Sequence, residues 1–398
     1  MKKEWSYKKL NKVCKVERGS SPRPIKEYLT TDSSGVNWIK IGDTKNVDKY
    51  IFSTKEKITI EGAKKSRYVK EGDFILSNSM SFGKPYIMKT DGFIHDGWFV
   101  LRLNENINSE FFWYLLSSPV VSKQFNMLAS GAIVKNISSD LVKKVVLPIP
   151  PIPEQQRIVE ILDQAFAAID QAIANTEKNL QNAQELFDSY LNSVFIDPPE
   201  YWKSCELNDH VKFIDYRGHT PNKIETGMRL ITAKNVKLGY LKNEPEEFVD
   251  PNIYDSWMVR GIPRKGDVLF TTEAPLANVA QLDTDEKVLF AQRIIILQPN
   301  ENKLDQTYLK YLLLSSPIRR KIFENGTGAT VKGIKAKLLK KIKIYFPEDI
   351  LIQKKIVQEL DSMWSNSQSL QSNYKQKLTN LHELKQSILQ KAFNGELT

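Results

Sequence analysis

Two short segments carry residue types that could perform chemistry. The segment Asp197-Pro198-Pro199-Glu200 resembles the Asp-Pro-Pro-aromatic motif of amino-methyltransferases, in which an aromatic ring stacks on an extruded base. Glu200 has no ring, and no nucleotide-binding strand-helix-strand pattern precedes it, so a turn is the favoured interpretation. Residues 324–328 contain a glycine pair similar to a loop for S-adenosylmethionine. A lone glycine pair is weak evidence for such a loop.

Other catalytic constellations are missing from the sequence. The four histidines are scattered along the chain and predict neither a metal cluster nor a catalytic triad. No Walker A segment for ATP is present. Cys14 and Cys205 offer neither a disulfide framework nor a zinc spacing, so we expect a reducing cytoplasm. The sequence therefore predicts a protein without catalytic activity of its own.

The chain repeats itself once, at a spacing of 197 to 198 residues. The stretch Gly-Ala-Ile-Val-Lys-Asn-Ile at 131–137 returns as Gly-Ala-Thr-Val-Lys-Gly-Ile at 328–334. Gln155 returns as Gln353, and Leu162-Asp163 return as Leu360-Asp361. The regions before these segments match only loosely. Two copies of one unit predict a pseudo-symmetric molecule with two similar working surfaces.

Composition favours several globular parts and a polyanionic partner. A length of 398 residues predicts about two to three domains, and 41% hydrophobic residues suffice for sizeable cores. The formal charge of +10 and the isoelectric point near 9.2 favour a negatively charged partner. No apolar run is long enough to span a bilayer, and the first residues lack an apolar signal core, so we expect no membrane association.

The order of patterns predicts an α+β protein of four blocks. Residues 1–153 mix short β-type runs with turns and one helix, and 197–348 repeat this pattern. Residues 154–196 and 349–398 are each expected to form a long helix. The proline-rich segment 148–153 separates the first globule from its helix, because consecutive prolines cannot continue a strand ladder.

Both predicted helices show the alternating spacings of three and four that are typical of a coiled-coil seam. The expected seam residues include Ile158, Leu162, Ile169, Leu180, Phe187, Ile356, Leu360, Leu370, Leu381 and Ile388. Two successive spacings of four end at Leu180 in the first helix and at Leu378 in the second. The supercoil should relax locally at these places.

Charge favours pairing of the two helices with each other. From 154 to 195 there are two basic and seven acidic residues, whereas 349 to 393 hold six basic and four acidic ones. Some 40 helical residues make a rod about 60 Å long, and antiparallel pairing would hold one globule at each end. Such a spacer suits a regular polymer such as duplex DNA. For a single helix, oligomerisation or bundle packing would be the simpler interpretation; the duplication favours the spacer.

The whole chain resembles the specificity subunits (HsdS) of type I restriction-modification systems. Residues 384–397, Leu-Lys-Gln-Ser-Ile-Leu-Gln-Lys-Ala-Phe-Asn-Gly-Glu-Leu, are similar to the distal conserved helix end of that family. Residues 150–159, Pro-Pro-Ile-Pro-Glu-Gln-Gln-Arg-Ile-Val, resemble the start of its central conserved region. The Gly-Ala-x-Val-Lys stretches at 131 and 328 and the segments 38–43 and 291–293 also fit.

The resemblance implies two target-recognition domains, residues 1–153 and 197–348, each reading one half of a bipartite duplex DNA site. It implies that the helices space these domains and dock two methyltransferase (M) subunits. Those subunits would bring S-adenosylmethionine and flip a target adenine, and restriction (R) subunits would bring ATP and Mg. No cofactor or metal is expected in this chain.

DNA contacts can be proposed at two kinds of position. Lys135 and Lys332 occupy the same place in the two repeats, beside small residues that let the backbone approach a phosphate. A solvated surface lysine is the alternative. Base contacts should lie where the copies differ, and packing or a turn role is the alternative for each of them. These base-contact candidates are Lys40, Ser77, Asn78, Lys84, Lys234, Asn235, Thr272 and Arg293.

Two functions from other classes remain open alongside DNA recognition. A structural coiled-coil adaptor, with basic globules that bind RNA or protein, would show no sequence preference for duplex DNA. An orphan enzyme would transfer methyl groups without any partner. The reading favoured by the sequence is a non-catalytic DNA-recognition subunit.

Overall fold

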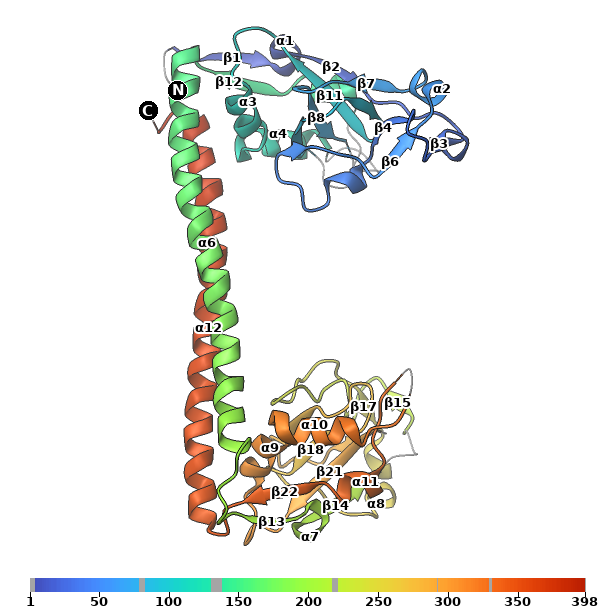
Figure 1. Cartoon of the computed structure of the whole chain (residues 1–398), viewed down its shortest axis with the longest axis vertical. Helices are drawn as coiled ribbons and strands as arrows, with labels where there is room; N and C mark the ends of the chain where they lie inside the picture. The colour runs from blue at the N-terminus through green and yellow to red at the C-terminus, as the bar shows by residue number, and fades with distance from the viewer. Residues whose placement is uncertain are drawn as a thin grey trace. The chain divides into compact units, whose positions relative to one another are not determined.

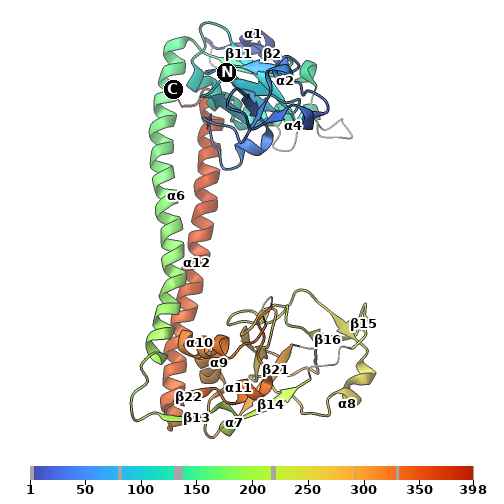
Figure 2. The ribbon, with the colours of Figure 1, turned by 45° about the vertical axis from the view of Figure 1, so that its right-hand side comes forward.

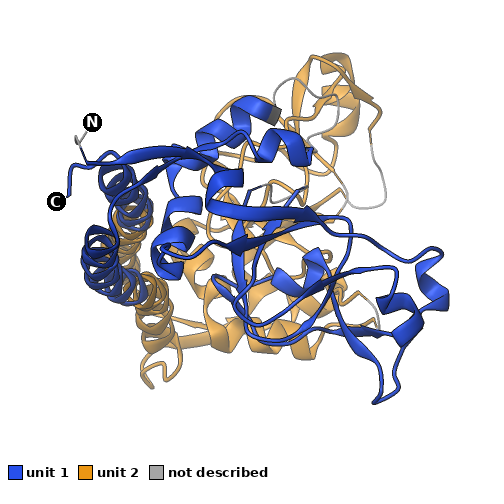
Figure 3. Ribbon diagram, turned by 90° about the horizontal axis from the view of Figure 1, so that it is seen from above, with its two compact units in different colours: residues 1–176, 376–398 blue, residues 177–375 orange. Residues whose placement is uncertain are grey.

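The computed structural model describes residues 4–78, 83–129, 138–216, 221–291, 293–328 and 331–397. The chain divides into two compact units, residues 1–176 with 376–398 and residues 177–375 (Figure 3). Each unit combines one globule with parts of two long helices, α6 (Ile152–Phe195) and α12 (Ile350–Phe393). The predicted helices are therefore present.

The first globule contains two five-stranded sheets. The first sheet has the order β2-β11-β8-β9-β5, with β2 (Cys14–Arg18), β5 (Tyr50–Ile51), β8 (Phe74–Ser77), β9 (Pro85–Met88) and β11 (Trp98–Leu103). The second sheet has the order β3-β6-β4-β10-β7, with β3 (Leu29–Thr30), β4 (Val36–Ile39), β6 (Glu56–Ile58), β7 (Arg67–Val69) and β10 (Gly92–Ile94). Every residue of β8 and β9 is buried, which explains why these strands read as continuous apolar runs rather than alternating ones.

Short helices and one extra strand pair complete this globule. Its helical elements are α1 (Leu10–Val13), α2 (Ile60–Ala63), α3 (Ser109–Leu116), α4 (Pro119–Ala129), α5 (Ser139–Val142) and the 3₁₀ turns η1 (Ile25–Glu27) and η2 (Ile41–Thr44). β1 (Ser6–Lys9) pairs with β12 (Val146–Ile149), which leads into α6. Helix α3 starts where the Asn108 side chain accepts a bond from the Phe111 backbone, and it packs Phe112 against Phe74 of β8.

The second globule repeats this plan with shorter sheets. One sheet has the order β14-β21-β18-β19, with β14 (Val211–Asp215), β18 (Val268–Thr271), β19 (Val279–Gln281) and β21 (Ile294–Pro299). The other has the order β15-β17-β16-β20, with β15 (Lys223–Ile224), β16 (Met228–Ile231), β17 (Phe248–Val249) and β20 (Leu289–Phe290). β13 (Lys203–Glu206) pairs with β22 (Lys343–Phe346), which leads into α12. The helical elements are α7 (Leu207–His210), η3 (Pro251–Ile253), α8 (Tyr254–Trp257), α9 (Gln306–Leu314), α10 (Ser316–Glu324) and α11 (Ala336–Lys340).

Strand register shows which residues of the two globules are equivalent. Trp98 of β11 stands opposite Ser77 of β8, and Ile294 of β21 stands opposite Thr271 of β18. Asn78 directly follows Ser77, and Thr272 directly follows Thr271, so Asn78 corresponds to Thr272. Their backbone N–H groups make the same bond, to the carbonyls of Gly97 and Arg293 respectively. The internal repeat thus extends into the loops, where the sequences differ.

In each unit the two long helices run side by side in opposite directions (Figures 1 and 2). In the first unit Lys385 of α12 forms an ion pair with Asp170 of α6. In the second unit the Ser367 hydroxyl of α12 donates to the Ala183 carbonyl of α6 at 2.6 Å. The predicted antiparallel pairing, and its support by opposite charge at Lys385, are confirmed.

Most of the expected seam is buried, with one exception. Ile158, Leu162, Ile169, Phe187 and Leu360 are buried, whereas Leu180, Ile356, Leu381 and Ile388 are half-buried. The prediction was wrong at Leu370, which is 38% exposed, and its half-buried neighbour Gln371 faces inward instead. Buried Ser367 lies between half-buried Met363 and Gln371, so the two successive spacings of four occur two seam positions earlier in α12 than expected.

In each unit, an equivalent glutamine joins the globule to the start of a long helix. The Gln155 side-chain oxygen accepts from the Asn108 backbone at 2.9 Å, and its amide donates to Pro150. Gln353 repeats this with the Asp305 backbone at 2.9 Å and with Pro347. Both glutamines are buried, so each fixes the start of a long helix against its globule.

Within the described part of the chain, no helix is long and apolar enough to cross a membrane.

Candidate nucleic-acid interface

In the first globule, the segments that follow strands β2, β4 and β10 line a common surface. We define the first strand-end surface as Ser21, Arg23, Lys40, His95 and Asp96, which line one pocket of about 770 Å³. The floor of this pocket includes Trp38, a fully buried ring. A surface that combines an apolar floor with charged and hydrogen-bonding groups suits contact with bases.

The charges of the first strand-end surface are paired within the protein. Asp96 accepts a 2.7 Å bond from the Ser21 hydroxyl and pairs with Arg23 at 3.3 Å. The bond from Ser21 lowers the pKa of the Asp96 carboxyl, and the charge of Arg23 acts in the same direction. Lys40 forms an ion pair with Glu56. These pairings hold the side chains in defined positions while leaving them partly exposed.

His95 is held as a neutral ring. Its Nε2 atom lies 3.2 Å from the Ile41 backbone nitrogen, and its Nδ1 atom lies 2.7 Å from that of Gly97. A neutral imidazole has one nitrogen that can accept, so one of these backbone N–H groups donates to the ring, whereas a protonated imidazolium could accept neither bond. Burial lowers the pKa of His95, and the charge of Lys40 adds to this effect. His95 therefore supports the loops of this surface without a charge.

The second globule presents a different set of residues around the loop between β20 and β21, which corresponds to the loop that carries His95 and Asp96 in the first globule. We define the second strand-end surface as Thr272, Glu273, Arg293 and Lys332. Arg293 Nε lies 3.2 Å from Glu273 Oε1. Glu273 forms an isolated β-bridge with Gly333, and the Ile334 backbone donates to the Thr272 carbonyl at 2.9 Å. The chain around Lys332 is thereby brought beside Glu273 and Arg293.

Four of the predicted base contacts are buried. Ser77 is fully buried, and Asn78 and Thr272 are 2% and 3% exposed. The Asn78 amide donates to the Asp96 carbonyl at 2.7 Å, and the Thr272 hydroxyl donates to the Arg293 carbonyl at 3.3 Å. These residues therefore shape the loops through contacts within the protein.

Asn235 is the clearest correction. It is 1% exposed, its oxygen accepts from the Thr232 backbone at 2.9 Å, and its amide donates to three carbonyls between Lys242 and Pro245. Asp43 makes the same type of turn in the first globule, by accepting from the Lys40 backbone at 2.7 Å. Asn235 is therefore a turn-holding residue, because all its hydrogen-bonding groups are used within the protein.

The predicted lysines differ in their surroundings. Lys84 donates to the Val47 carbonyl at 3.1 Å, and exposed Lys234 lies 3.7 Å from Glu247. Lys332 is exposed. Its repeat counterpart Lys135 lies outside the described residues. The structure thus leaves Lys332 available to a phosphate, whereas Lys234 already has an acidic neighbour.

Sequence reasoning missed the acidic partners. Glu273 and Asp96 were not candidates, yet they hold Arg293 and Arg23 respectively. A signal was present for Glu273, which directly follows Thr272 and is a charged residue in a loop between apolar runs. Asp96 could be recognised only from the contact between two loops that are 75 residues apart in the chain.

A lysine-rich segment adds positive charge to the second globule. We call residues 332–343 the lysine run, because they contain Lys332, Lys335, Lys337, Lys340, Lys341 and Lys343. The sequence has no acidic residue between Glu324 and Glu348. The equivalent stretch 135–146 has three lysines and one aspartate. The second globule therefore has the stronger local attraction for a polyanion.

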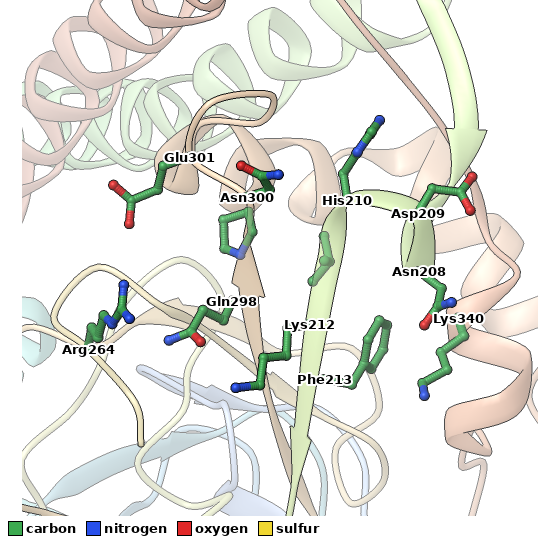
Figure 4. A pocket seen from close by; sticks show the side chains of 12 residues that line it. Asn208, Asp209, His210, Lys212, Phe213, Arg264, Gln298, Asn300, Glu301 and Lys340 are labelled. Carbon is green, nitrogen blue, oxygen red and sulfur yellow. The ribbon is translucent and has the colours of Figure 1, made fainter. Parts of the chain in front are cut away.

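The lysine run borders a polar pocket of about 790 Å³ (Figure 4). Lys340, Lys212 and Arg264 line it together with acidic Asp209 and Glu301. Its charge is therefore mixed. Gln298 and Pro299 place it at the far end of β21 from Arg293, so this pocket is not part of the second strand-end surface.

The described residues offer little for catalysis. Burial raises the pKa of the Cys14 thiol to about 12 and that of Cys205 to about 11, so neither is a thiolate at neutral pH. Among the described residues, no group of three or more histidine, cysteine or acidic side chains is placed to hold a metal ion. The surfaces found here are suited to recognition.

The sequence is similar to known DNA specificity proteins. The family model described as "Type I restriction modification DNA specificity domain" matches residues 2–181 and 260–380. The chain is 26% identical over 321 residues to the EcoBI specificity subunit of Escherichia coli, covering 74% of this chain and 67% of that protein. It is 25% identical over 319 residues to the EcoKI specificity subunit of Escherichia coli strain K12, covering 75% and 68%.

Solved structures share the fold. The HsdS subunit from Thermoanaerobacter tengcongensis superimposes with a TM-score of 0.62 at 21% identity, covering 100% of this chain and 98% of that one. A chain from a structure of complex assembly and conformational transition in the type I restriction-modification system reaches 0.79 at 21% identity, covering 100% and 99%. The match of the family model over most of the sequence confirms the resemblance: this chain belongs to the type I restriction-modification DNA specificity family.

Proposed function

We propose that each globule reads one half of a bipartite duplex DNA target. Membership of the specificity family assigns the chain to DNA target recognition, with catalysis in partner subunits. One observation supports two separate readings: the equivalent loops before β11 and β21 carry different charged groups, Asp96 paired with Arg23 in the first globule and Arg293 paired with Glu273 in the second. Similar loops with different side chains suit two different half-sites.

The long helices would set the spacing between the half-sites. Each has 44 residues, which at about 1.5 Å per residue gives a length of about 66 Å. A stiff connection between two DNA readers selects for separation and helical phase as well as for sequence. The glutamines Gln155 and Gln353 support this role, since each fixes a globule to the start of a helix.

Partner subunits would supply the chemistry. We propose that two methyltransferase subunits dock on the helices and bring S-adenosylmethionine, and that restriction subunits bring ATP and Mg where they are present. A chain that reads chromosomal DNA would work in the cytoplasm of a bacterial or archaeal cell. The chain itself would provide sequence recognition and geometry.

Methylation-sensitive sequencing tests this proposal. DNA would be taken from cells that express type I methyltransferase subunits, with and without this chain. A split adenine-methylated motif that appears only with the chain is the expected result. Methylation that is absent, or is indifferent to the chain, would contradict the proposal and favour a coiled-coil adaptor that binds RNA or protein.

A further inference from the structure

The second strand-end surface holds an arginine–glutamate pair at a position where the first globule has no side chain. Strand register places Arg293 where the first globule has Gly97. The Arg293 and Glu273 side chains are 45% and 46% exposed, so the pair lies at the surface. A surface ion pair adds little to stability, because water screens it. Its presence at a reading loop calls for another explanation.

Arg293 is held in a strained backbone conformation. Its φ of 81° lies in the left-handed region, which is unfavourable for a long side chain. Its carbonyl accepts bonds from both the backbone and the hydroxyl of Thr272, at 2.8 and 3.3 Å. The surroundings therefore impose this conformation, which fixes the direction in which the side chain leaves the backbone. Strain of this kind concentrates at functional sites.

The neighbouring loop is constrained as well. Ala274 and Ala277, which follow Glu273, have φ values of 44° and 62°. A Cβ atom at Gly333 would lie 3.2 Å from Glu273 Cβ and 3.3 Å from the Thr272 carbonyl, so the chain before Ile334 packs closely on Glu273. Both members of the ion pair are thus positioned by their backbones.

We propose that Arg293 reads a guanine in the half-site of the second globule and that Glu273 positions it. This inference rests on the proposed function. Glu273 engages Nε, and among the described residues the two terminal nitrogens of Arg293 have no hydrogen-bond partner. Those two nitrogens match the O6 and N7 acceptors of guanine, which arginine binds through two parallel bonds.

The glutamate favours a base over a phosphate. A carboxylate beside the guanidinium repels a phosphate group, whereas the edge of a base carries no net charge. Glu273 Oε2 also has no partner in the described part of the chain, and a carboxylate oxygen accepts from the N4 amino group of cytosine. The pair Arg293–Glu273 could therefore read both bases of one G·C pair. Lys332 precedes Gly333, which bridges to Glu273, and would contact the DNA backbone nearby.

The test uses the full chain with its methyltransferase subunits. The methylated motif of the wild type is determined first, and then those of Arg293→Ala, Arg293→Lys and Glu273→Gln. The matched control is Arg320→Ala, which removes an exposed arginine of the same unit outside this surface. We expect Arg293→Ala to relax one guanine position in the second half of the motif and to leave the first half unchanged. Binding to the wild-type motif should fall by about 5- to 150-fold.

Two further measurements separate base reading from a structural role. Replacing that guanine by 7-deazaguanine removes N7 and should weaken wild-type binding but not that of Arg293→Ala. Glu273→Gln should lower the preference for guanine while raising affinity for unrelated DNA, because a repulsive charge is lost. A merely structural glutamate would weaken both equally.

These experiments separate a failure of the Arg293 assignment from a failure of the proposed function. If the wild type directs no chain-dependent motif, the proposed function fails. If the wild type directs a motif and the Arg293→Ala variant keeps every guanine of that motif, then only the assignment of Arg293 is overturned. A change caused equally by Arg320→Ala would also overturn it, since a general loss of charge would then explain the effect.

Discussion

The Tyr311 hydroxyl donates a 2.5 Å hydrogen bond to Asp361 Oδ1, which joins helix α9 of the second globule to α12. Tyr114 makes the same bond to Asp163 in the first unit, also at 2.5 Å. Both phenols are buried, and burial together with the neighbouring carboxylate raises the pKa of each tyrosine well above its usual value. With Gln155 and Gln353, these bonds repeat one joint between globule and helix in both units.

Removing this joint should destabilise the second unit. We expect Tyr311→Phe to lower the free energy of unfolding by about 1–3 kcal/mol, since a hydrogen bond to a carboxylate is lost. Urea denaturation followed by circular dichroism measures the change. Tyr201→Phe is the control, because Tyr201 is 75% exposed. An equal effect of both substitutions would contradict the role of the Asp361 bond.

The same tyrosines predict sensitivity to high pH. Their folded-state pKa values are raised, so their stabilising contribution is complete below the unfolded value near 10 and is lost as pH rises toward the folded value. We expect stability to fall between about pH 10 and 12, and to fall less in a Tyr114→Phe, Tyr311→Phe double variant. Denaturation midpoints across this pH range provide the measurement. A parallel decline in both proteins would contradict the prediction.

His95 predicts a loss of stability in mild acid. Its folded-state pKa is lowered, chiefly by burial, so its contribution is complete above the unfolded value of about 6.5 and falls as pH decreases toward the folded value. We expect the difference in stability between wild type and His95→Gln to shrink as pH falls from about 7 to 5. Thermal unfolding in matched buffers tests this. A difference that stays constant would show that the ring does not titrate differently on unfolding.

Lys332 should contribute to binding without regard to sequence. We expect Lys332→Ala to weaken binding to all duplexes and to reduce the slope of log affinity against log salt by about 0.9, the value for one phosphate contact. Replacing Lys335, Lys337 and Lys341 together tests three of the other five lysines of the lysine run. Lys287→Ala, an exposed lysine of the same unit outside the run, is the control. An unchanged slope would remove Lys332 from the interface.

Asn235 should affect stability and not specificity. Asn235→Ala removes the donor to three backbone carbonyls and the acceptor for Thr232, so we expect a loss of about 2–3 kcal/mol with an unchanged methylated motif. Asn235→Asp keeps the acceptor for Thr232 but sets a carboxylate oxygen against the three carbonyls, so we expect it to destabilise the protein as well. Thermal unfolding and motif sequencing provide the two readouts. A relaxed motif in a stably folded Asn235→Ala protein would restore this residue as a base contact.

The helices were largely predictable because their signal is local and periodic. Ile158, Leu162 and Phe187 follow a heptad pattern that any helix of this sequence must display on one face. Leu370 was misplaced because spacings of three and four fit its neighbourhood equally well. Only packing against the facing helix decides which of Leu370 and Gln371 turns inward.

The sequence by itself determined the internal repeat, the paired helices, the family and the excess of positive charge, since these depend on residue type and spacing along the chain. The tertiary structure decided which polar residues are available to DNA. Asn235 and Arg293 are equally good candidates in the sequence. In the structure, the Asn235 side chain forms its hydrogen bonds within a turn, whereas Arg293 is held at the surface by Thr272 and Glu273. The partners of a side chain come from loops distant in the chain, and their approach depends on strand register and backbone conformation that no local pattern encodes.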